Sequence, residues 1–311
     1  MVLAGGTGGA KLARGMLDVV DAGELTVIAN TGDDIEIYGA YVSPDPDLVA
    51  FWLADRIDAR GWGLGDDTFE VMDGLREIGE EVWFNLGDRD LAIGLQRAQA
   101  LDRGERLTEA HARLVHWLGI PAEVLPMSDQ PVRTRVMAGD RWWPLQEFLI
   151  RARPAWGSGE EAGIQDVVFR GAGAATATAE ALAAIAEAQA VVIGPSNPVL
   201  SIGPMLALED LRLALIETAA PVVAVSPIVN GDVLKGPTAE CMAWRQVPVS
   251  ADGVASLYAG LIDAIVCDEA VSAEVPALRT DTLMRDAAQR RRLAEETLGF
   301  ALALGREPAA S

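Results

Sequence analysis

The feature that most constrains the fold is a regular alternation of short apolar strands with helical stretches. Residues 2–4 and 25–29 form two apolar strands, which are joined by a glycine turn and a helix expected over 11–20. The second half repeats the pattern in two further helix–strand pairs (176–188 then 190–193, and 205–218 then 222–225). Strands connected through crossover helices lie parallel in one sheet. We therefore predict an α/β fold, with a Rossmann-like parallel sheet that carries helices on both faces.

The remaining segments predict how one domain over residues 1–311 is organised. Its Rossmann-like core is expected from 1–47 and 165–270. Residues 48–120 have helical periodicity and acidic faces, which predicts a mostly helical insertion over the carboxyl edge of the sheet. The later segments are expected to be a hairpin, a loop and a C-terminal amphipathic helix (135–150 with its turn at 138–140, 151–165 and 285–305).

The overall charge and the cysteines exclude several classes of function. The net charge is −21, and a nucleic-acid partner requires a basic face, so none is expected. No apolar run approaches the roughly 20 residues that span a bilayer. Cys241 and Cys267 are too few and too far apart for a disulfide framework or a metal cluster, so we interpret them as buried apolar residues. We expect a cytoplasmic protein without a membrane partner.

The glycine turn at the N-terminus is the first candidate binding element. Glycines between a strand and a helix bring the N–H groups of the helix start close to an anion, so Gly6, Thr7, Gly8, Gly9 and Lys11 form a candidate phosphate site. A dinucleotide-binding fingerprint requires a glycine where Lys11 stands, and a P-loop requires Ser or Thr directly after that lysine. A purely structural turn remains the alternative.

A group of carboxylates follows the second strand. Asp33, Asp34, Asp45 and Asp47 lie within 15 positions, and in a parallel sheet they would face the glycine turn. Mg²⁺ prefers one or two carboxylates together with phosphate oxygens. We therefore predict a Mg²⁺ site at Asp33, Asp34 and Asp45, with Asp47 either contacting substrate or capping the helix that follows it.

Two turns after the late strands, and one motif before a helix, complete the candidates. Ser196 and Asn197 stand between two prolines, and Ser226 and Lys235 follow the next strand. Rigid polar turns at a carboxyl edge are suited to a nucleotide or a phosphate, with loop stiffening as the alternative. The segment 87–90, Gly-Asp-Arg-Asp, could present its arginine to a phosphate or an aromatic ring, although a surface ion pair would explain it equally well.

Taken in order, these segments resemble the 2-phospho-L-lactate transferase family. The resemblance spans nearly the whole chain, and its specificity comes from the joint order of the motifs rather than from any one of them. The matching segments are Ala-Gly-Gly-Thr-Gly-Gly-Ala-Lys (4–11), Asn-Thr-Gly-Asp-Asp (30–34), Ser-Pro-Asp-Pro-Asp (43–47), Gly-Trp-Gly (61–63), Leu-Gly-Asp-Arg-Asp-Leu-Ala (86–92), Leu-Pro-Met-Ser-Asp (125–129), Pro-Val-Arg-Thr (131–134), Ile-Gly-Pro-Ser-Asn-Pro (193–198), Ser-Ile-Gly-Pro (201–204), Val-Ser-Pro-Ile-Val (225–229) and Lys-Gly-Pro (235–237).

The resemblance implies a reaction. The terminal ribityl hydroxyl of a deazaflavin would attack a phosphorus of a guanosine-diphosphate-linked three-carbon acid, and GMP would leave. Mg²⁺ is the implied cofactor and a homodimer the implied assembly. The resemblance also implies the site residues: Asp45, Asp47 and Arg89 would be catalytic, the glycine turn, Lys11 and the late turns would bind the donor, and the acceptor would contact five residues (Asp47, Asp88, Arg89, Ser128 and Asp129).

The chain departs from the family pattern at two places. Ile93-Gly94 stands where the family commonly has Thr-His, and Asn230-Gly231 stands where Gly-Gly is common. The first departure removes two polar side chains beside the implied acceptor site. Two alternative functions remain at this point: a non-catalytic regulator of a sister family that binds nucleotide sugars, and an NAD-dependent oxidoreductase.

Overall fold

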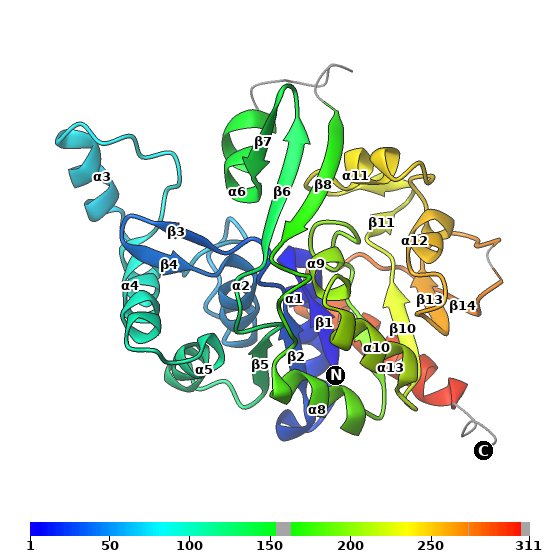
Figure 1. The fold of residues 1–311 in the computed structure, drawn as a ribbon. Helices are drawn as coiled ribbons and strands as arrows, with labels where there is room; N and C mark the ends of the chain where they lie inside the picture. The colour runs from blue at the N-terminus through cyan, green and yellow to red at the C-terminus, as the bar shows by residue number, and fades with distance from the viewer. Residues whose placement is uncertain (154–162, 273, 306–311) are drawn as a thin grey trace.

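The structure is a computed structural model that describes residues 1–153, 163–272 and 274–305. A seven-stranded sheet forms its centre, with the strand order β14-β13-β10-β9-β1-β2-β5, and every neighbouring pair is parallel (Figure 1). The strands are β1 (Val2–Ala4), β2 (Thr26–Ala29), β5 (Glu123–Pro126), β9 (Val191–Ile193), β10 (Val222–Val225), β13 (Ala264–Cys267) and β14 (Ala277–Arg279). The predicted Rossmann-like parallel sheet is confirmed.

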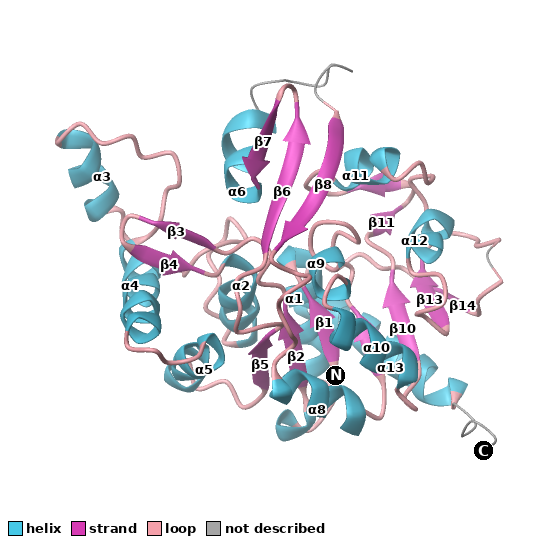
Figure 2. Ribbon diagram, viewed as in Figure 1, coloured by secondary structure: helices cyan, strands magenta, loops and turns pink. Residues whose placement is uncertain are grey.

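Helices cover both faces of this sheet, because successive side chains of each buried strand point to opposite sides. On one face, Val2 and Ala4 of β1 pack in the same cluster as residues of α1 (Gly6–Leu17), α2 (Pro44–Leu53) and α13 (Ala287–Leu304). On the other face, Leu3 packs with residues of four helices, namely α8 (Ala179–Glu187), α9 (Gly203–Leu206), α10 (Glu209–Glu217) and α12 (Ala251–Leu257). Figure 2 shows the magenta strands between these two layers of cyan helices.

Helix α1 begins five residues earlier than the helix expected at 11–20, so the glycines form its first turn. The reason is close packing. A Cβ atom at Gly8 would lie 2.0 Å from the carbonyl oxygen of Pro195, and one at Gly9 would lie 2.5 Å from Oγ of Ser196. Glycine therefore allows the start of α1 to lie directly against the turn after β9.

The segment after α2 contains α3 (Glu70–Glu77), α4 (Asp88–Asp102) and α5 (Leu107–Trp117), within the region predicted to be mostly helical. Before α2, β3 (Ile35–Ile37) and β4 (Ala40–Val42) form a hairpin against which α4 packs. Helix α2, expected within the insertion, packs instead on α1 in the layer that covers the sheet.

A second, antiparallel sheet stands above the carboxyl edge of the central one (Figure 1). It contains β6 (Arg133–Ala138), β7 (Arg141–Pro144) and β8 (Ile164–Arg170), and the predicted hairpin is its β6–β7 pair. We expected residues from 165 onward in the Rossmann-like core, but β8 pairs with β6. A short helix, α6 (Leu145–Glu147), and one π-helical turn (Phe148–Ala152) follow β7; most of the loop expected at 151–165 lies outside the described residues.

The turn after β10 leads into a small hairpin, β11 (Ile228–Val229) and β12 (Asp232–Val233), followed by α11 (Thr238–Trp244). Asn230 and Gly231 join its strands with φ of 51° and 76°. A two-residue turn of this kind needs positive φ at both positions, which Asn-Gly adopts readily. The departure from Gly-Gly at this point therefore keeps the backbone geometry.

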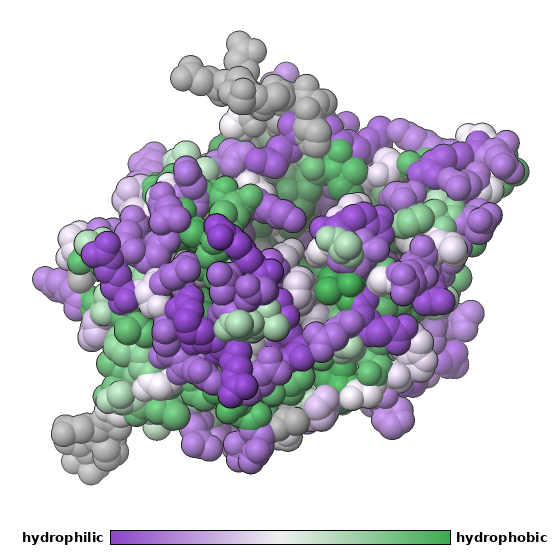
Figure 3. Space-filling view, turned by 180° about the vertical axis from the view of Figure 1, so that it is seen from behind, coloured by the Kyte–Doolittle hydropathy of each residue, from purple (hydrophilic) through white to green (hydrophobic). Residues whose placement is uncertain are grey.

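Hydrophilic residues cover much of the surface seen from behind, with hydrophobic residues in smaller patches between them (Figure 3). Both cysteines are buried and free, as predicted. None of the helices in the described part of the chain is long and apolar enough to cross a membrane.

Candidate active site

A cavity of about 490 Å³ lies at the carboxyl ends of β1, β2, β9 and β10. The strand order reverses direction between β1 and β9, and an open α/β sheet binds ligands in the crevice outside such a switch point. The loops that follow these four strands meet there. Of the residues predicted from the sequence, ten line this cavity: Gly6, Thr7, Gly8, Lys11, Asp33, Asp45, Ser196, Asn197, Ser226 and Lys235.

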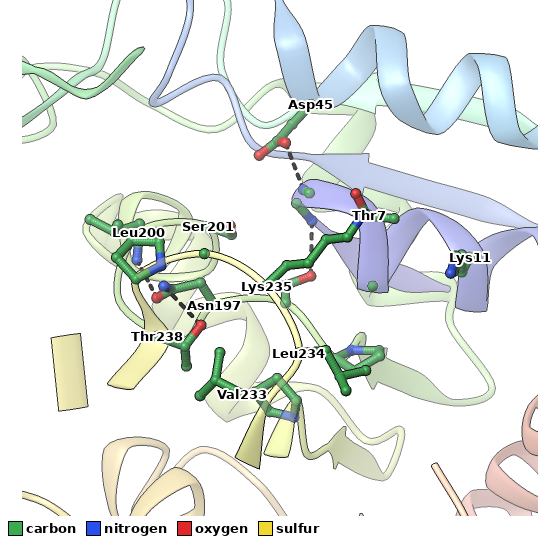
Figure 4. Close-up of a pocket in the computed structure, with 18 of the residues that line it drawn as sticks. Thr7, Lys11, Asp45, Asn197, Leu200, Ser201, Val233, Leu234, Lys235 and Thr238 are labelled. Atoms are coloured by element: carbon green, nitrogen blue, oxygen red, sulfur yellow. Dashed lines mark hydrogen bonds between the residues drawn. The ribbon is translucent and has the colours of Figure 1, made fainter. Parts of the chain in front are cut away.

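The start of α1 forms the floor of the cavity (Figure 4). The first four N–H groups of a helix have no partner within it. Here the N–H of Gly5 donates to Ser196 Oγ at 3.1 Å, and the N–H of Gly6 donates to Asp45 Oδ1 at 2.6 Å. The next two N–H groups, of Thr7 and Gly8, belong to residues that line the cavity, where an anion could accept from them.

Two carboxylates face this floor. The side-chain amide of Asn30 donates to Asp45 at 2.9 Å and to Asp33 at 3.4 Å, which brings the two acids together. Burial raises the pKa of Asp45 to about 6. Burial, and then the charge of Asp45, raises the pKa of Asp33 well above its usual range. No basic side chain of the described residues forms an ion pair with either acid, and a bound cation would supply the compensating positive charge.

Asp34, the third predicted metal ligand, does not line the cavity with the other two. Its carboxylate accepts hydrogen bonds from the hydroxyls of Tyr41 at 2.9 Å and Ser43 at 2.7 Å. Burial raises its pKa to about 7. Among the described residues, no group of three or more His, Cys, Asp or Glu side chains could hold a metal ion. Two carboxylates together with phosphate oxygens still match the preference of Mg²⁺.

The chain contains two lysines, and both line this cavity. Lys11 extends from α1 and donates to the carbonyl of Met284 at 3.2 Å. Lys235 reaches in from the loop after β12 (Figure 4). Burial lowers the pKa of Lys11, and the charges of Lys235 and Arg290 lower it further, so the three cations share one region. In a chain of net charge −21, such a concentration of positive charge indicates an anionic ligand.

The polar turns after β9 and β10 line the cavity, but much of their hydrogen bonding is internal. Oδ1 of Asn197 accepts from the N–H groups of Val199 and Leu200, both at 2.9 Å, and its amide donates to Thr238 at 3.2 Å. Ser226 Oγ accepts from Ile228 at 3.2 Å. The loop-stiffening interpretation therefore applies to these residues even though they form the cavity wall.

Asp47 does not line the cavity. Arg97 is fully buried. Both of its terminal nitrogens donate hydrogen bonds to the Asp47 carboxylate, and one of them also donates to the Tyr41 carbonyl at 3.0 Å. Asp47 does not cap α2 either, because Ser43 occupies that position and Asp47 lies inside the first turn. The charge of Asp47 is therefore neutralised by Arg97 inside the protein.

The other residues predicted to bind the acceptor are also apart from the main cavity. Asp88 accepts from the first N–H groups of α3, at Glu70 and Val71, and Asp129 accepts from the N–H and hydroxyl of Thr108 at the start of α5. Ser128 donates to a main-chain carbonyl. Arg89 is exposed and, with Ile93, lines a second cavity of about 470 Å³ between α4 and α5. Their role in acceptor binding stays a prediction.

The sequence interpretation missed one wall of the main cavity. Thr282, Leu283, Met284 and Arg285, between β14 and α13, line it on the side of Lys11. No strand–turn motif marks this segment, and its distance along the chain from the glycines concealed it. The acceptor of the Lys11 hydrogen bond belongs to it.

Comparisons with known proteins show the family of this chain. Residues 1–296 match the family described as 2-phospho-L-lactate transferase CofD. Relatives include 2-phospho-L-lactate transferases from Methanosarcina mazei, 36% identical over 95% of this chain and 98% of the relative, and from Haloarcula marismortui, 38% identical over 94% and 95%. A phosphoenolpyruvate transferase from Kitasatospora aureofaciens is 39% identical over 87% of this chain and 85% of the relative.

The fold is also found in a solved structure. A UPF0052-family protein from Bacillus halodurans aligns with a TM-score of 0.60 and 16% identity, covering 96% of this chain and 97% of the other. At that identity the likeness shows the fold alone. The family match and the relatives show more: this chain is a transferase enzyme and belongs to the 2-phospho-L-lactate transferase CofD family.

Proposed function

We propose that this enzyme transfers a phospholactate or phosphoenolpyruvate unit from a guanosine-diphosphate-linked donor to 7,8-didemethyl-8-hydroxy-5-deazariboflavin, releasing GMP, as a step of coenzyme F420 biosynthesis. The family match and the names of the relatives support this reaction class. Those names include both a phospholactate and a phosphoenolpyruvate transferase, so they support either three-carbon unit.

One observation carries the proposal: the cavity at the switch point has a cationic side and an acidic side. Lys11 and Lys235 are both available to the phosphates of a donor, together with the N–H groups at the start of α1. The carboxylates of Asp33 and Asp45 both accept a hydrogen bond from the side-chain amide of Asn30. A nucleoside diphosphate with a bound divalent cation has complementary charge to both sides.

Asp33 and Asp45 are the residues that would hold Mg²⁺ in this protein, because both line the cavity and both are buried without a cationic partner among the residues that the structure describes. When bound there, the ion would neutralise charge on the donor's phosphate oxygens. Asn30 fixes the relative position of the two carboxylates, and the Gly6 N–H fixes Asp45 against the start of α1.

The proposed step exchanges one oxygen for another at phosphorus. The acceptor hydroxyl forms a bond to the phosphorus that carries the three-carbon acid. The bond from that phosphorus to the bridging oxygen breaks, GMP leaves with that oxygen, and the hydroxyl proton is released. The chain's contribution is to hold the donor with Lys11, Lys235 and the start of α1 while the phosphorus is attacked.

The direct test is incubation of the enzyme with the deazaflavin, Mg²⁺ and either lactyl- or enolpyruvyl-diphospho-guanosine, followed by mass spectrometry. We expect a deazaflavin product heavier by the corresponding phosphoester, with an equal amount of GMP. Lack of product with both donors, by an enzyme that binds them, would exclude the proposed reaction.

The family match favours this reaction over the two alternatives raised by the sequence, a nucleotide-sugar-binding regulator and an NAD-dependent oxidoreductase. In the same incubation, a regulator would bind nucleotide without forming product, and an oxidoreductase would require NADH. We further expect a cytoplasmic homodimer, which size-exclusion chromatography with light scattering would test for assembly.

A further inference from the structure

The segment before α13 contains a buried hydroxyl at the cavity wall that no described residue pairs with. Thr282 is only 3% exposed, and its Oγ1 makes no hydrogen bond within residues 1–153, 163–272 and 274–305. In contrast, the hydroxyl oxygens of Ser196, Ser226 and Thr238 in the same cavity each accept a hydrogen bond from the protein. Leaving a buried polar group unpaired destabilises the folded protein, so a hydrogen bond from Thr282 to a ligand would remove that cost.

Positive charge is concentrated beside this hydroxyl. Arg285, three residues further on, lines the cavity, and Lys11 is hydrogen-bonded to the carbonyl between them, that of Met284. Within the described residues, Lys11, Lys235 and Arg285 form no ion pair with an acidic side chain. Many arginines on the surface of the described residues are paired with an acid, as Arg291 is with Glu295. The cations at the cavity are therefore left for a ligand.

We propose that residues 282–285 complete the donor site as an anion subsite, in which the Thr282 hydroxyl donates to an anionic oxygen group held by Lys11 and Arg285. That group is either a phosphate of the donor's diphosphate or the carboxylate of its three-carbon acid. The inference rests on the proposed function, because it specifies how the same donor is recognised. The proposed subsite gives residues 282–285, near the C-terminal helix, a role in binding the donor.

The test compares the binding of two probes by calorimetry in the presence of Mg²⁺: GDP, which has only the diphosphate, and the complete lactyl-diphospho-guanosine. The variants are Thr282→Val, which keeps the shape and removes the hydroxyl, and Arg285→Gln. Two matched controls lie on α13 outside the cavity. Thr297→Val removes another buried, unpartnered hydroxyl, and Arg291→Gln removes an exposed arginine charge.

We expect Thr282→Val and Arg285→Gln each to weaken binding roughly tenfold or more, the effect of losing one hydrogen bond to a charged group. Equal losses for both probes identify the subsite with the diphosphate, and a loss confined to the complete donor identifies it with the three-carbon carboxylate. Thr282→Val should leave the melting temperature of the free protein unchanged or higher, because an unpaired buried hydroxyl is removed. If Thr282 had only a structural role, its substitution would not weaken donor binding while leaving the melting temperature unchanged or higher.

Wild-type affinity for both probes in Thr282→Val and Arg285→Gln would overturn the anion subsite while leaving the proposed function intact. Failure of the wild-type enzyme to bind either probe would overturn the proposed function and the subsite together. Equal weakening in the two α13 controls would also overturn the inference, because it would show an effect of the helix rather than of the cavity wall.

Discussion

At the scale of single residues, the pairing of Arg97 with Asp47 changes the interpretation of a motif that otherwise reads as catalytic. The guanidinium holds the carboxylate and the Tyr41 carbonyl at once, and so fixes the two ends of the segment that includes Asp45. His111 packs at the same place, with Nδ1 3.8 Å from the Asp47 carboxylate, and burial and Arg97 lower its pKa to about 3. This neutral histidine does not compensate either charge.

Asp47→Asn should therefore act first on stability. It removes the carboxylate that is paired with the buried Arg97, and breaking such a buried pair costs about 3–5 kcal/mol in the free energy of unfolding. Chemical denaturation measures this directly. Asp55→Asn is the control, because Asp55 pairs with Arg14 at the surface, where an ion pair contributes less than about 1 kcal/mol. Equal stability of the two variants would mean that Arg97 has another partner for its charge.

Lys11→Ala and Lys235→Ala should each weaken GDP binding by about 1.5–3 kcal/mol, or roughly 10- to 150-fold, through loss of one charge-assisted contact. The matched control is Arg14→Ala, which removes a positive charge from the outer part of α1, where Arg14 pairs with Asp18 and Asp55. Calorimetry of GDP binding to the three variants tests this prediction. A similar loss of affinity in Arg14→Ala would show that the effect comes from long-range electrostatics rather than from direct contact with the phosphates.

At the scale of elements, the apolar strands were predictable and their surroundings less so. The runs at β1, β2, β9 and β10 are continuous and buried, which is typical of a parallel sheet, and their order places the cavity correctly. β5 was missed because it begins with Glu123 and ends with Pro126, which leaves only two apolar residues between a charge and a proline. The start of α1 was placed too late because glycine is a poor helix former, and only its contact with Pro195 explains glycine there.

The site was predictable to the extent that its residues follow strands. The glycines, both lysines, Asp33 and Asp45 were identified in this way. Asp47, Asp88 and Asp129 lie in motifs that are equally suggestive. Their carboxylates, however, accept hydrogen bonds from residues of other elements, namely Arg97, Val71 and Thr108. Residues 282–285 carry no local motif, so their place at the cavity depends on how α13 packs against α1.

Gly8→Ala should disturb the contact between α1 and the turn after β9, because its Cβ would lie 2.0 Å from the Pro195 oxygen. We expect a loss of about 1–3 kcal/mol in stability, as for other overpacked positions, and weaker GDP binding. Gly299→Ala on α13 is the matched control. A Cβ there meets no atom within 4 Å, so alanine should stabilise the helix by about 0.5–1 kcal/mol. Denaturation and calorimetry of both variants would show whether the contact matters.

Asp90, near the start of α4, should make stability depend on pH. Burial, and then the charge of Asp47, raises its pKa to about 7, whereas the unfolded chain ionises near 3.8. The folded state keeps the proton longer, so this group removes stability as pH rises from about 4 to 7. Asp90→Asn should therefore gain on the order of 1–4 kcal/mol relative to wild type at pH 8, and little at pH 4.

Urea denaturation at both pH values measures this difference. Asp73→Asn, on the exposed surface of α3, provides the comparison. A gain for Asp90→Asn that is the same at both pH values would show that a contact, rather than ionisation, is responsible.

At the scale of the whole molecule, one cavity connects both halves of the chain. Its walls come from the ends of β1 and β2, from those of β9 and β10, and from the segment before α13. A ligand that binds there should therefore oppose unfolding of the entire sheet. This stabilisation is about 2.7 kcal/mol when the ligand is present at 100 times its Kd.

Thermal unfolding with GDP tests this expectation together with the proposed cation. We expect GDP with Mg²⁺ to raise the melting temperature by several degrees, and a chelator to remove most of that rise. With wild-type enzyme, an equal rise with and without chelator would contradict the proposed metal at Asp33 and Asp45.

The restriction of lysine to the cavity has a practical consequence for handling this protein. Lys11 and Lys235 are the two lysines of the sequence, and the amine of Met1 donates to the Ala190 carbonyl at 2.9 Å. Dyes, biotin or resins coupled to lysine would attach at this cavity, and we expect them to weaken binding of the proposed donor. The same reagents, applied with and without donor, would report occupancy of the cavity by mass spectrometry at two positions. Labels meant to leave the enzyme working should be placed elsewhere, on an introduced surface cysteine, because Cys241 and Cys267 are buried.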